Sequence, residues 1–379
     1  ISSPKSQNLI EEAHRVRPTS GLEFVSSRHF PEEVQGDLLI NNTIGFLGTK
    51  QHKFIGKGTG YESKHRQDLI VGTDPNFRPV DMEFAPDGSL YIVDWHNVLV
   101  GHMQHNARDP LRDHAHGRIY RVTYPSRPLV VPASIDGASI AVLLNHLKLP
   151  EYRTRYRSRR ALRGKDADLV SVALKVWVAN LDPNDQAYDH HLLEALWVSW
   201  GNNQIDLDLL DEVFHSENYR LRAAAVRVMR YMGVQIPRSE EWIIQASADP
   251  HGQVRLEAIV AASWLDEEVA QKVLSAVARL PLDDWMRDTY NTVASNFGIL
   301  VVSEMDEQNK SREERVDLEE SDLELYHLGK SIYAKDGYCA TCHQVDGKGI
   351  KSAGFPPLKG TQWVLGDEER LIKITLNGV

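Results

Sequence analysis

The two cysteines of this 379-residue chain lie three positions apart, at Cys339 and Cys342, and His343 follows directly. The spacing C-x-x-C also occurs in redox pairs and in half of a zinc site. The added histidine is typical of haem attachment, in which both thiols bond to haem vinyl groups and the histidine binds the iron. Because there are no other cysteines, no disulfide framework can support the rest of the chain.

The residues around this motif favour haem attachment over a thioredoxin-like pair, which would need a βαβ context. Residues 322–335 predict an amphipathic helix, a glycine loop and a proline loop follow the motif, and a second helix is predicted near Asp367. This order resembles that of small class I c-type cytochromes. The resemblance implies that a carbonyl in the loop of Pro356 and Pro357 accepts the Nδ1 hydrogen of His343 and orients its ring.

The predicted cofactor-binding residues are therefore Cys339, Cys342, His343 and Pro357, with His343 as the metal ligand. In such cytochromes a later methionine usually supplies the sixth iron ligand, but no methionine follows His343. We therefore expect a chain truncated at its C-terminal end, with the distal ligand beyond Val379. A five-coordinate or histidine-ligated haem is the alternative.

The middle of the chain, residues 132–302, predicts helices that repeat. The segment that begins at Asp249 copies an earlier segment at an offset of 33 residues, so that Arg222 aligns with Arg255. Two looser copies precede them, and a recurring helical unit of this kind resembles HEAT-type repeats. We expect Asp249 to cap the second helix of its repeat and the arginines to bind carboxylates or carbonyls of neighbouring repeats. The alternative is an irregular helical bundle, and in either case the region is a spacer or a docking surface.

The N-terminal part, residues 1–131, predicts β-structure. Two strands of alternating pattern in residues 78–95 flank the turn signal Pro86-Asp87-Gly88, and another strand is expected over 117–122. This hairpin resembles one blade of a β-propeller. Only about two blades fit the available length, whereas a propeller needs at least four. We therefore expect the C-terminal blades of a propeller that is cut at its N-terminal end.

A histidine-rich loop joins these strands. Five of the 16 histidines fall within 21 residues, between positions 96 and 116. Histidine beside a carboxylate can ligate a metal, or it can act as the base when a substrate loses a proton or a hydride. The candidate catalytic residues are Asp94, His102, His105, Asp113 and His116. The alternative is a loop held by hydrogen bonds from His and Asp to the backbone, which the lack of a metal-binding spacing such as H-E-x-x-H favours.

Charge separates the last two domains and limits the partners. Residues 303–324 hold ten acidic and three basic residues, which predicts an acidic linker at 303–321 before a cytochrome domain at 322–379.

The formal net charge of −10 argues against nucleic acid or an anionic membrane surface as the main partner. No apolar run is long enough to span a membrane. We expect a multidomain fold: a partial β-propeller, a HEAT-like helical solenoid and an incomplete all-α cytochrome c domain.

The whole order resembles the PVC-type haem-binding C-x-x-C-H proteins, often labelled membrane-bound dehydrogenases. The resemblance rests on residues 78–81, 91–95, 101–106, 112–122 and 190–197. It implies a periplasmic or extracytoplasmic dehydrogenase, membrane-associated through a preceding segment, that oxidises a sugar or alcohol and passes electrons to haem c. Pyrroloquinoline quinone and calcium are the implied propeller cofactors, and a redox protein is the implied partner. The alternative is a non-catalytic electron carrier whose propeller and repeats bind a protein or a polysaccharide.

Overall fold

The structure is a computed structural model, and it falls into two units. One unit contains the sheets and the helical repeats, and the other contains residues 302–379 with two short N-terminal pieces. Each unit is described by itself. The described residues are 19–98, 109–110, 112–298, 320–335, 339–344, 346–349, 355–367, 369, 371–372 and 375.

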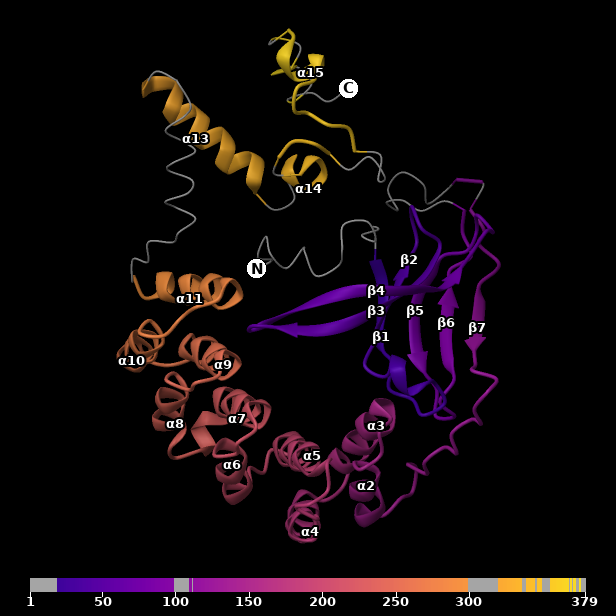
Figure 1. Ribbon diagram of the computed structural model, residues 1–379, viewed down its shortest axis with the longest axis vertical. Helices are drawn as coiled ribbons and strands as arrows, with labels where there is room; N and C mark the ends of the chain where they lie inside the picture. The colour runs from indigo at the N-terminus through magenta and orange to yellow at the C-terminus, as the bar shows by residue number, and fades with distance from the viewer. Residues whose placement is uncertain are drawn as a thin grey trace. The chain divides into compact units, whose positions relative to one another are not determined.

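The described strands form two sheets (Figure 1). In the first sheet the strand order is β1-β2-β3-β4, and in the second it is β5-β6-β7. The strands are β1 Thr19–Phe24, β2 Leu38–Asn42, β3 Gly48–Lys57, β4 Gly60–Val71, β5 Pro79–Phe84, β6 Leu90–Asp94 and β7 Arg118–Val122, and a short 3-10 helix, η3, covers Glu32–Val34.

The predicted hairpin forms, because β5 pairs antiparallel with β6 and Phe84 lies opposite Leu90. Its inward side chains alternate with exposed ones, as expected of a half-buried strand pair. They share one core with Val25, Phe30 and Leu39 of the first sheet's segment. A four-stranded sheet has the strand number of a propeller blade. The described strands nevertheless form two sheets and no ring of blades, so the partial β-propeller stays a prediction.

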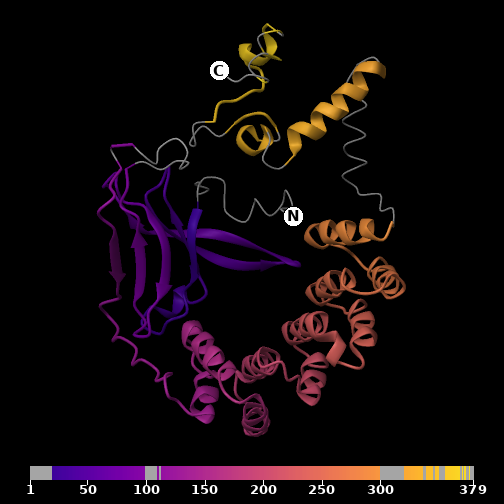
Figure 2. The same cartoon turned by 180° about the vertical axis from the view of Figure 1, so that it is seen from behind.

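Helices follow the sheets and stack in an arc (Figures 1 and 2). Their buried side chains form one continuous core, from Leu143 in the first of these helices to Ala294 in the last. Such a core is what stacked repeats build, since one repeat cannot bury its apolar face alone. The helices are α2 Ile140–His146, α3 Tyr152–Arg163, α4 Ala167–Ala179, α5 Tyr188–Gly201, α6 Leu207–Phe214, α7 Tyr219–Met232, α8 Ser239–Ala246, α9 Gly252–Ala262, α10 Glu267–Val277 and α11 Asp284–Asn296, with the 3-10 helix η4 at Gly233–Gln235.

The predicted arginine ladder is confirmed. Arg155, Arg222 and Arg255 each donate from Nη1 to the carbonyl oxygens five and six residues earlier, at 2.6–3.0 Å. All three also reach the segment that follows. Arg155 Nε donates to Glu194 at 2.9 Å, and Arg222 donates to both carboxylate oxygens of Asp249 at 2.7 and 2.9 Å. Arg255 Nη2 donates to the carbonyl oxygen of Pro281 at 3.0 Å. The arginines therefore tie each helix to the turn before it and to the following repeat.

The predicted capping role of Asp249 is wrong. The N-cap of α9 is His251, whose Nδ1 accepts from the backbone N–H of Gln253 at 3.2 Å. Asp249 lies two residues earlier, accepts from the His251 N–H at 2.7 Å and binds Arg222. Its carboxylate therefore connects two repeats instead of completing one helix.

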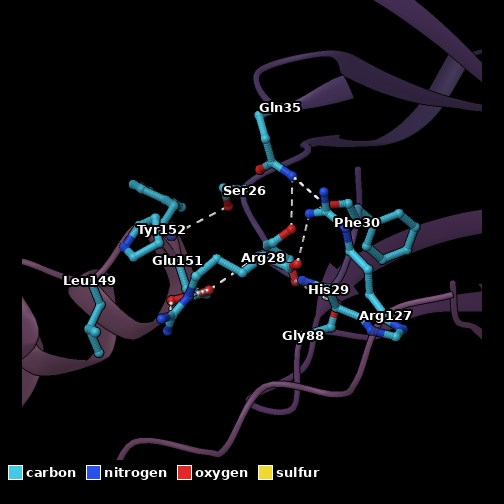
Figure 3. Close-up of polar contacts among 12 residues, drawn as sticks. Ser26, Arg28, His29, Phe30, Gln35, Gly88, Arg127, Leu149, Glu151 and Tyr152 are labelled. Atoms are coloured by element: carbon cyan, nitrogen blue, oxygen red, sulfur yellow. Dashed lines mark hydrogen bonds and ion pairs between the residues drawn. The ribbon is translucent and has the colours of Figure 1, made fainter. Parts of the chain in front are cut away.

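Charged contacts join the sheets to the first repeat (Figure 3). The buried carboxylate of Glu151, just before α3, accepts from Arg28 at Nε, Nη2 and the backbone N–H at 2.7, 3.0 and 3.2 Å. The neighbouring Arg153 donates to Glu23 in β1 at 2.5 and 2.9 Å. These contacts link segments more than 120 residues apart in the sequence.

Candidate haem-attachment site

The three residues of the haem motif lie on one short helix of the C-terminal unit. This unit contains α13 Glu320–Ala334, α14 Cys339–His343 and α15 Gln362–Leu365. Residues three and four apart share a helix face, so Cys339, Cys342 and His343 are presented on the same side of α14. Both cysteines are free thiols, Cys339 exposed and Cys342 half-buried. The two thiols are thus accessible to a ligand that lies beside the histidine.

His343 is oriented by the proline loop. Its Nδ1 lies 2.9 Å from the carbonyl oxygen of Pro356. A carbonyl can only accept, so Nδ1 carries the hydrogen and the lone pair of Nε2 is left for a metal. The acceptor is Pro356, one residue before the Pro357 named from the sequence. The bond is of the kind that fixes the tautomer and the ring plane of metal-binding histidines.

Gly349 makes this bond possible. Its N–H donates to the His343 carbonyl at 2.8 Å, and its φ is +69°. A Cβ at this position would lie 2.4–2.6 Å from the carbonyl groups of Phe355 and Pro356. Only glycine allows the backbone to pass so close. The loop therefore needs Gly349 to keep the Pro356 carbonyl beside the histidine.

Tyr333 connects α13 to the end of the motif. Its hydroxyl donates to the carbonyl oxygen of Gln344 at 2.8 Å, and Gln344 has a φ of +64°. Burial raises the pKa of Tyr333, so the phenol stays protonated and remains a donor across the physiological range. Tyr333 was not among the predicted site residues, because an aromatic residue near the end of a helix is usually part of the core.

The residues present fit a haem. Among the described residues between 321 and 375 no side chain is fully buried, and Leu325, Leu328 and Leu365 are 57–68% exposed. Exposed apolar side chains on the helices of a small domain favour an apolar partner, and a large planar cofactor is one. The donor set of two thiols and an Nε2 lone pair matches a covalently attached iron porphyrin.

Asp94, one of the candidate catalytic residues, binds backbone N–H groups at the end of β6. Its carboxylate is 1% exposed, and Oδ1 accepts from the N–H groups of Arg78 at 2.7 Å and His96 at 2.8 Å. His96 lies two residues after the end of β6 and has a φ of +53°, a conformation that costs energy outside glycine. Asp94 therefore stabilises a strained turn at the end of the strand.

Two of the other candidate residues lie together. His116 Nδ1 lies 2.8 Å from Oδ2 of Asp113, and Asp113 Oδ1 accepts from the N–H groups of Ala115 and His116 at 2.9 and 3.0 Å. Hydrogen bonds from the Ala115 backbone and the His116 side chain lower the pKa of Asp113 to about 2. A carboxylate with so low a pKa is a weak proton acceptor. His102 and His105 lie outside the described residues.

His96 joins this group, although it was not among the candidates. Its Nε2 lies 3.5 Å from Asp113 Oδ2 and 3.3 Å from Nη2 of Arg118. Because an arginine can only donate, Nε2 accepts from Arg118 and Nδ1 carries the hydrogen. The signal in the sequence was its place two residues after the end of a predicted strand. Within the part of the chain that the structure describes, no three His, Cys, Asp or Glu side chains form a group that could hold a metal ion.

Fold and site together define a multidomain protein in which antiparallel sheets and helical repeats precede a c-type haem-attachment domain. Family models match the chain in three places: cytochrome c at residues 326–378, HEAT repeats at 207–291, and a domain of unknown function (DUF7133) at 2–126. No curated protein and no solved structure matches it. The chain thus carries a cytochrome c domain and HEAT-like repeats, which supports a role in haem electron transfer.

A cytochrome c domain is typically extracytoplasmic, because its haem is attached there. None of the described helices has the length and the apolar content to span a membrane.

Proposed function

We propose that this protein is an extracytoplasmic electron carrier in which Cys339 and Cys342 bind a haem covalently and His343 is its axial ligand. The observation that carries the proposal is the bond between His343 Nδ1 and the Pro356 carbonyl, which leaves Nε2 for iron. Bound haem would supply one-electron oxidation and reduction. The chain's own groups orient the ligand through Pro356, and the exposed leucines of α13 are available to exclude water.

Mass spectrometry tests the attachment. The chain is expressed with a haem-maturation system, denatured, and its mass is compared with that of a variant carrying Cys339→Ala and Cys342→Ala. We expect the mass of one haem on the unsubstituted chain after denaturation and none on the variant. The proposal would be contradicted if this chain carries no covalent haem although a control cytochrome expressed with the same maturation system does.

We further propose that the sheet region belongs to a dehydrogenase that oxidises a sugar or alcohol. Two supports are the resemblance over residues 78–122 and the group formed by His96, Asp113 and His116 at one end of the second sheet. Oxidation of a CH–OH group to a carbonyl releases two protons, which go to water, and two electrons. The haem would take up these electrons one at a time and pass each to a redox partner. Among the described residues, no cluster of His, Cys, Asp or Glu side chains could hold a metal ion such as calcium.

A specific observation favours the second candidate, a carrier that oxidises no substrate. Asp94 is fully buried and Asp113 has a pKa of about 2, and both carboxylates accept hydrogen bonds from backbone N–H groups. Such carboxylates stabilise the fold and are poor catalytic bases. In that case the sheets and repeats bind a protein or polysaccharide partner.

The haem absorption bands distinguish the two candidates. The oxidised, haem-loaded protein is mixed with a panel of sugars and alcohols, with and without pyrroloquinoline quinone and calcium. Reduction by one substrate class supports the dehydrogenase. If no substrate reduces a haem that dithionite still reduces, the dehydrogenase is wrong and the electron carrier stands.

A further inference from the structure

A long hairpin formed by β3 and β4 extends from the first sheet to the last repeats (Figure 1). At its tip, Thr59 donates from its backbone N–H and from Oγ1 to the two carboxylate oxygens of Asp283, at 2.6 and 2.5 Å. Gly60 packs directly on Trp285, because a Cβ there would lie 2.5–2.7 Å from the indole ring. The tip is therefore fixed against the start of α11 and cannot move freely over the repeats.

An open cavity of about 390 Å³ lies between this tip and the helices α5, α7 and α9. Its volume falls in the range of small-molecule sites. Aliphatic side chains form much of the lining, and aromatic and polar side chains complete it. These are Thr59 and Tyr61 on the hairpin, Trp197 on α5, Arg220 and Arg227 on α7, and Gln253 and Glu257 on α9.

The cavity has an excess of positive charge. Glu257 accepts from Arg227 Nε at 3.0 Å and also lies 3.4 Å from Arg230, so one carboxylate serves two arginines. Arg220 is exposed and has no ion pair among the residues that the structure describes; its guanidinium lies 5.3 Å from the centre of the Tyr219 ring. A guanidinium without an ion pair at the lining of a cavity favours an anionic group in the ligand.

We propose that this cavity binds an acidic sugar unit of an oligosaccharide. A sugar ring has an apolar C–H face, which suits the rings of Trp197 and Tyr61, and hydroxyl groups, which suit the amide of Gln253. Its carboxylate or sulfate pairs with Arg220. A peptide is less suited, because the helices lining the cavity offer no free backbone groups for it. The site does not depend on the proposed electron transfer.

Calorimetric titration of the full, haem-loaded chain tests the site with three hexasaccharides of equal length. The probes are hexagalacturonate, a sulfated galactose hexasaccharide and the neutral galactose hexasaccharide. We expect at least one anionic probe to bind tenfold or more tightly than the neutral one, and the stronger of the two identifies the acid group. Arg220→Gln should remove this preference.

Arg160→Gln is the matched control, because Arg160 is also exposed and lies 5.8 Å from a tyrosine ring, that of Tyr156, outside the cavity. Circular dichroism establishes that both variants fold. The proposal is overturned if neither anion binds more tightly than the neutral sugar, or if Arg220→Gln and Arg160→Gln behave alike. It is also overturned if hexaglutamate binds as tightly as the anionic sugars through Arg220, since the ligand is then an acidic peptide.

Discussion

At the residue scale, the orientation of the haem ligand His343 depends on a backbone carbonyl of the proline loop and on no side chain of that loop. The Pro356 carbonyl reaches His343 because Gly349 has no Cβ. The C-x-x-C-H motif and the proline loop could be predicted from the sequence, since both are local patterns. The identity of the accepting carbonyl and the roles of Tyr333 and Gly349 could not, because they depend on how the loop folds back.

We predict that Gly349→Ala leaves the haem attached but weakens its axial ligation. The new Cβ would meet the carbonyls of Phe355 and Pro356, so the loop must move and the Nδ1 bond is lost. Loss of such a supporting bond typically costs about 10–100-fold in metal affinity. The measurement is the guanidinium concentration at which the haem absorption spectrum of the folded protein is lost. Gly360→Ala is the control, since Gly360 has a similar φ of +74° with nothing within 4 Å of a Cβ.

A pH-dependent prediction concerns Asp113. Its pKa in the folded chain, about 2, is below the value of about 3.9 in an unfolded chain, so its charge stabilises the fold above the unfolded value. That contribution is lost as the pH falls from about 4 through about 2. Asp113→Asn keeps an oxygen acceptor and removes the charge. We expect the variant to be less stable at pH 6 and the difference to shrink at pH 3, measured by urea unfolding at both values. An equal difference at both pH values would contradict this role.

At the element scale, the repeat of helical segments in the sequence was the best predictor of the structure. The offset of 33 residues aligns Arg222 with Arg255, and both make the same pair of carbonyl contacts. The prediction that Asp249 caps α9 was wrong, because the sequence pattern does not show whether its carboxylate binds its own helix or Arg222 of the preceding repeat. The β3–β4 hairpin was missed, since its mixed polar residues alternate poorly and its tip contacts Asp283, 224 residues away.

We predict that Arg222→Lys destabilises the repeats by about 1.5–3 kcal/mol, because lysine cannot keep two bonds to Asp249 and two to backbone carbonyls. The free energy of unfolding in urea is the measurement. Arg160→Lys, which alters an exposed arginine, should change it by less than about 0.5 kcal/mol. Equal effects of the two substitutions would show that the ladder contributes little.

At the scale of the whole molecule, the sheets and the repeats are joined at two distant places. Arg28 binds Glu151 near the first repeat, and Thr59 binds Asp283 near the last described helix of the arc. These contacts make one compact unit of two fold types. Neither contact could be predicted from local sequence, since each pairs residues that are more than 120 positions apart.

We predict that Thr59→Val loosens the hairpin tip without unfolding the sheets. Valine has nearly the same shape but lacks the hydroxyl that donates to Asp283, which removes about 1 kcal/mol and speeds local opening about fivefold. Hydrogen–deuterium exchange of residues 52–66 measures the opening. Exchange of the β5–β6 hairpin is the internal control and should stay unchanged.

The central claim is that His343 holds a redox-active haem in this chain. Optical redox titration of the haem-loaded protein, beside its His343→Ala variant, tests it most directly. We predict a reversible one-electron transition in the unsubstituted protein and a changed haem spectrum and midpoint potential in the variant, with covalent haem retained in both. An identical spectrum and potential in the two proteins would show that His343 is not the ligand and would contradict the account.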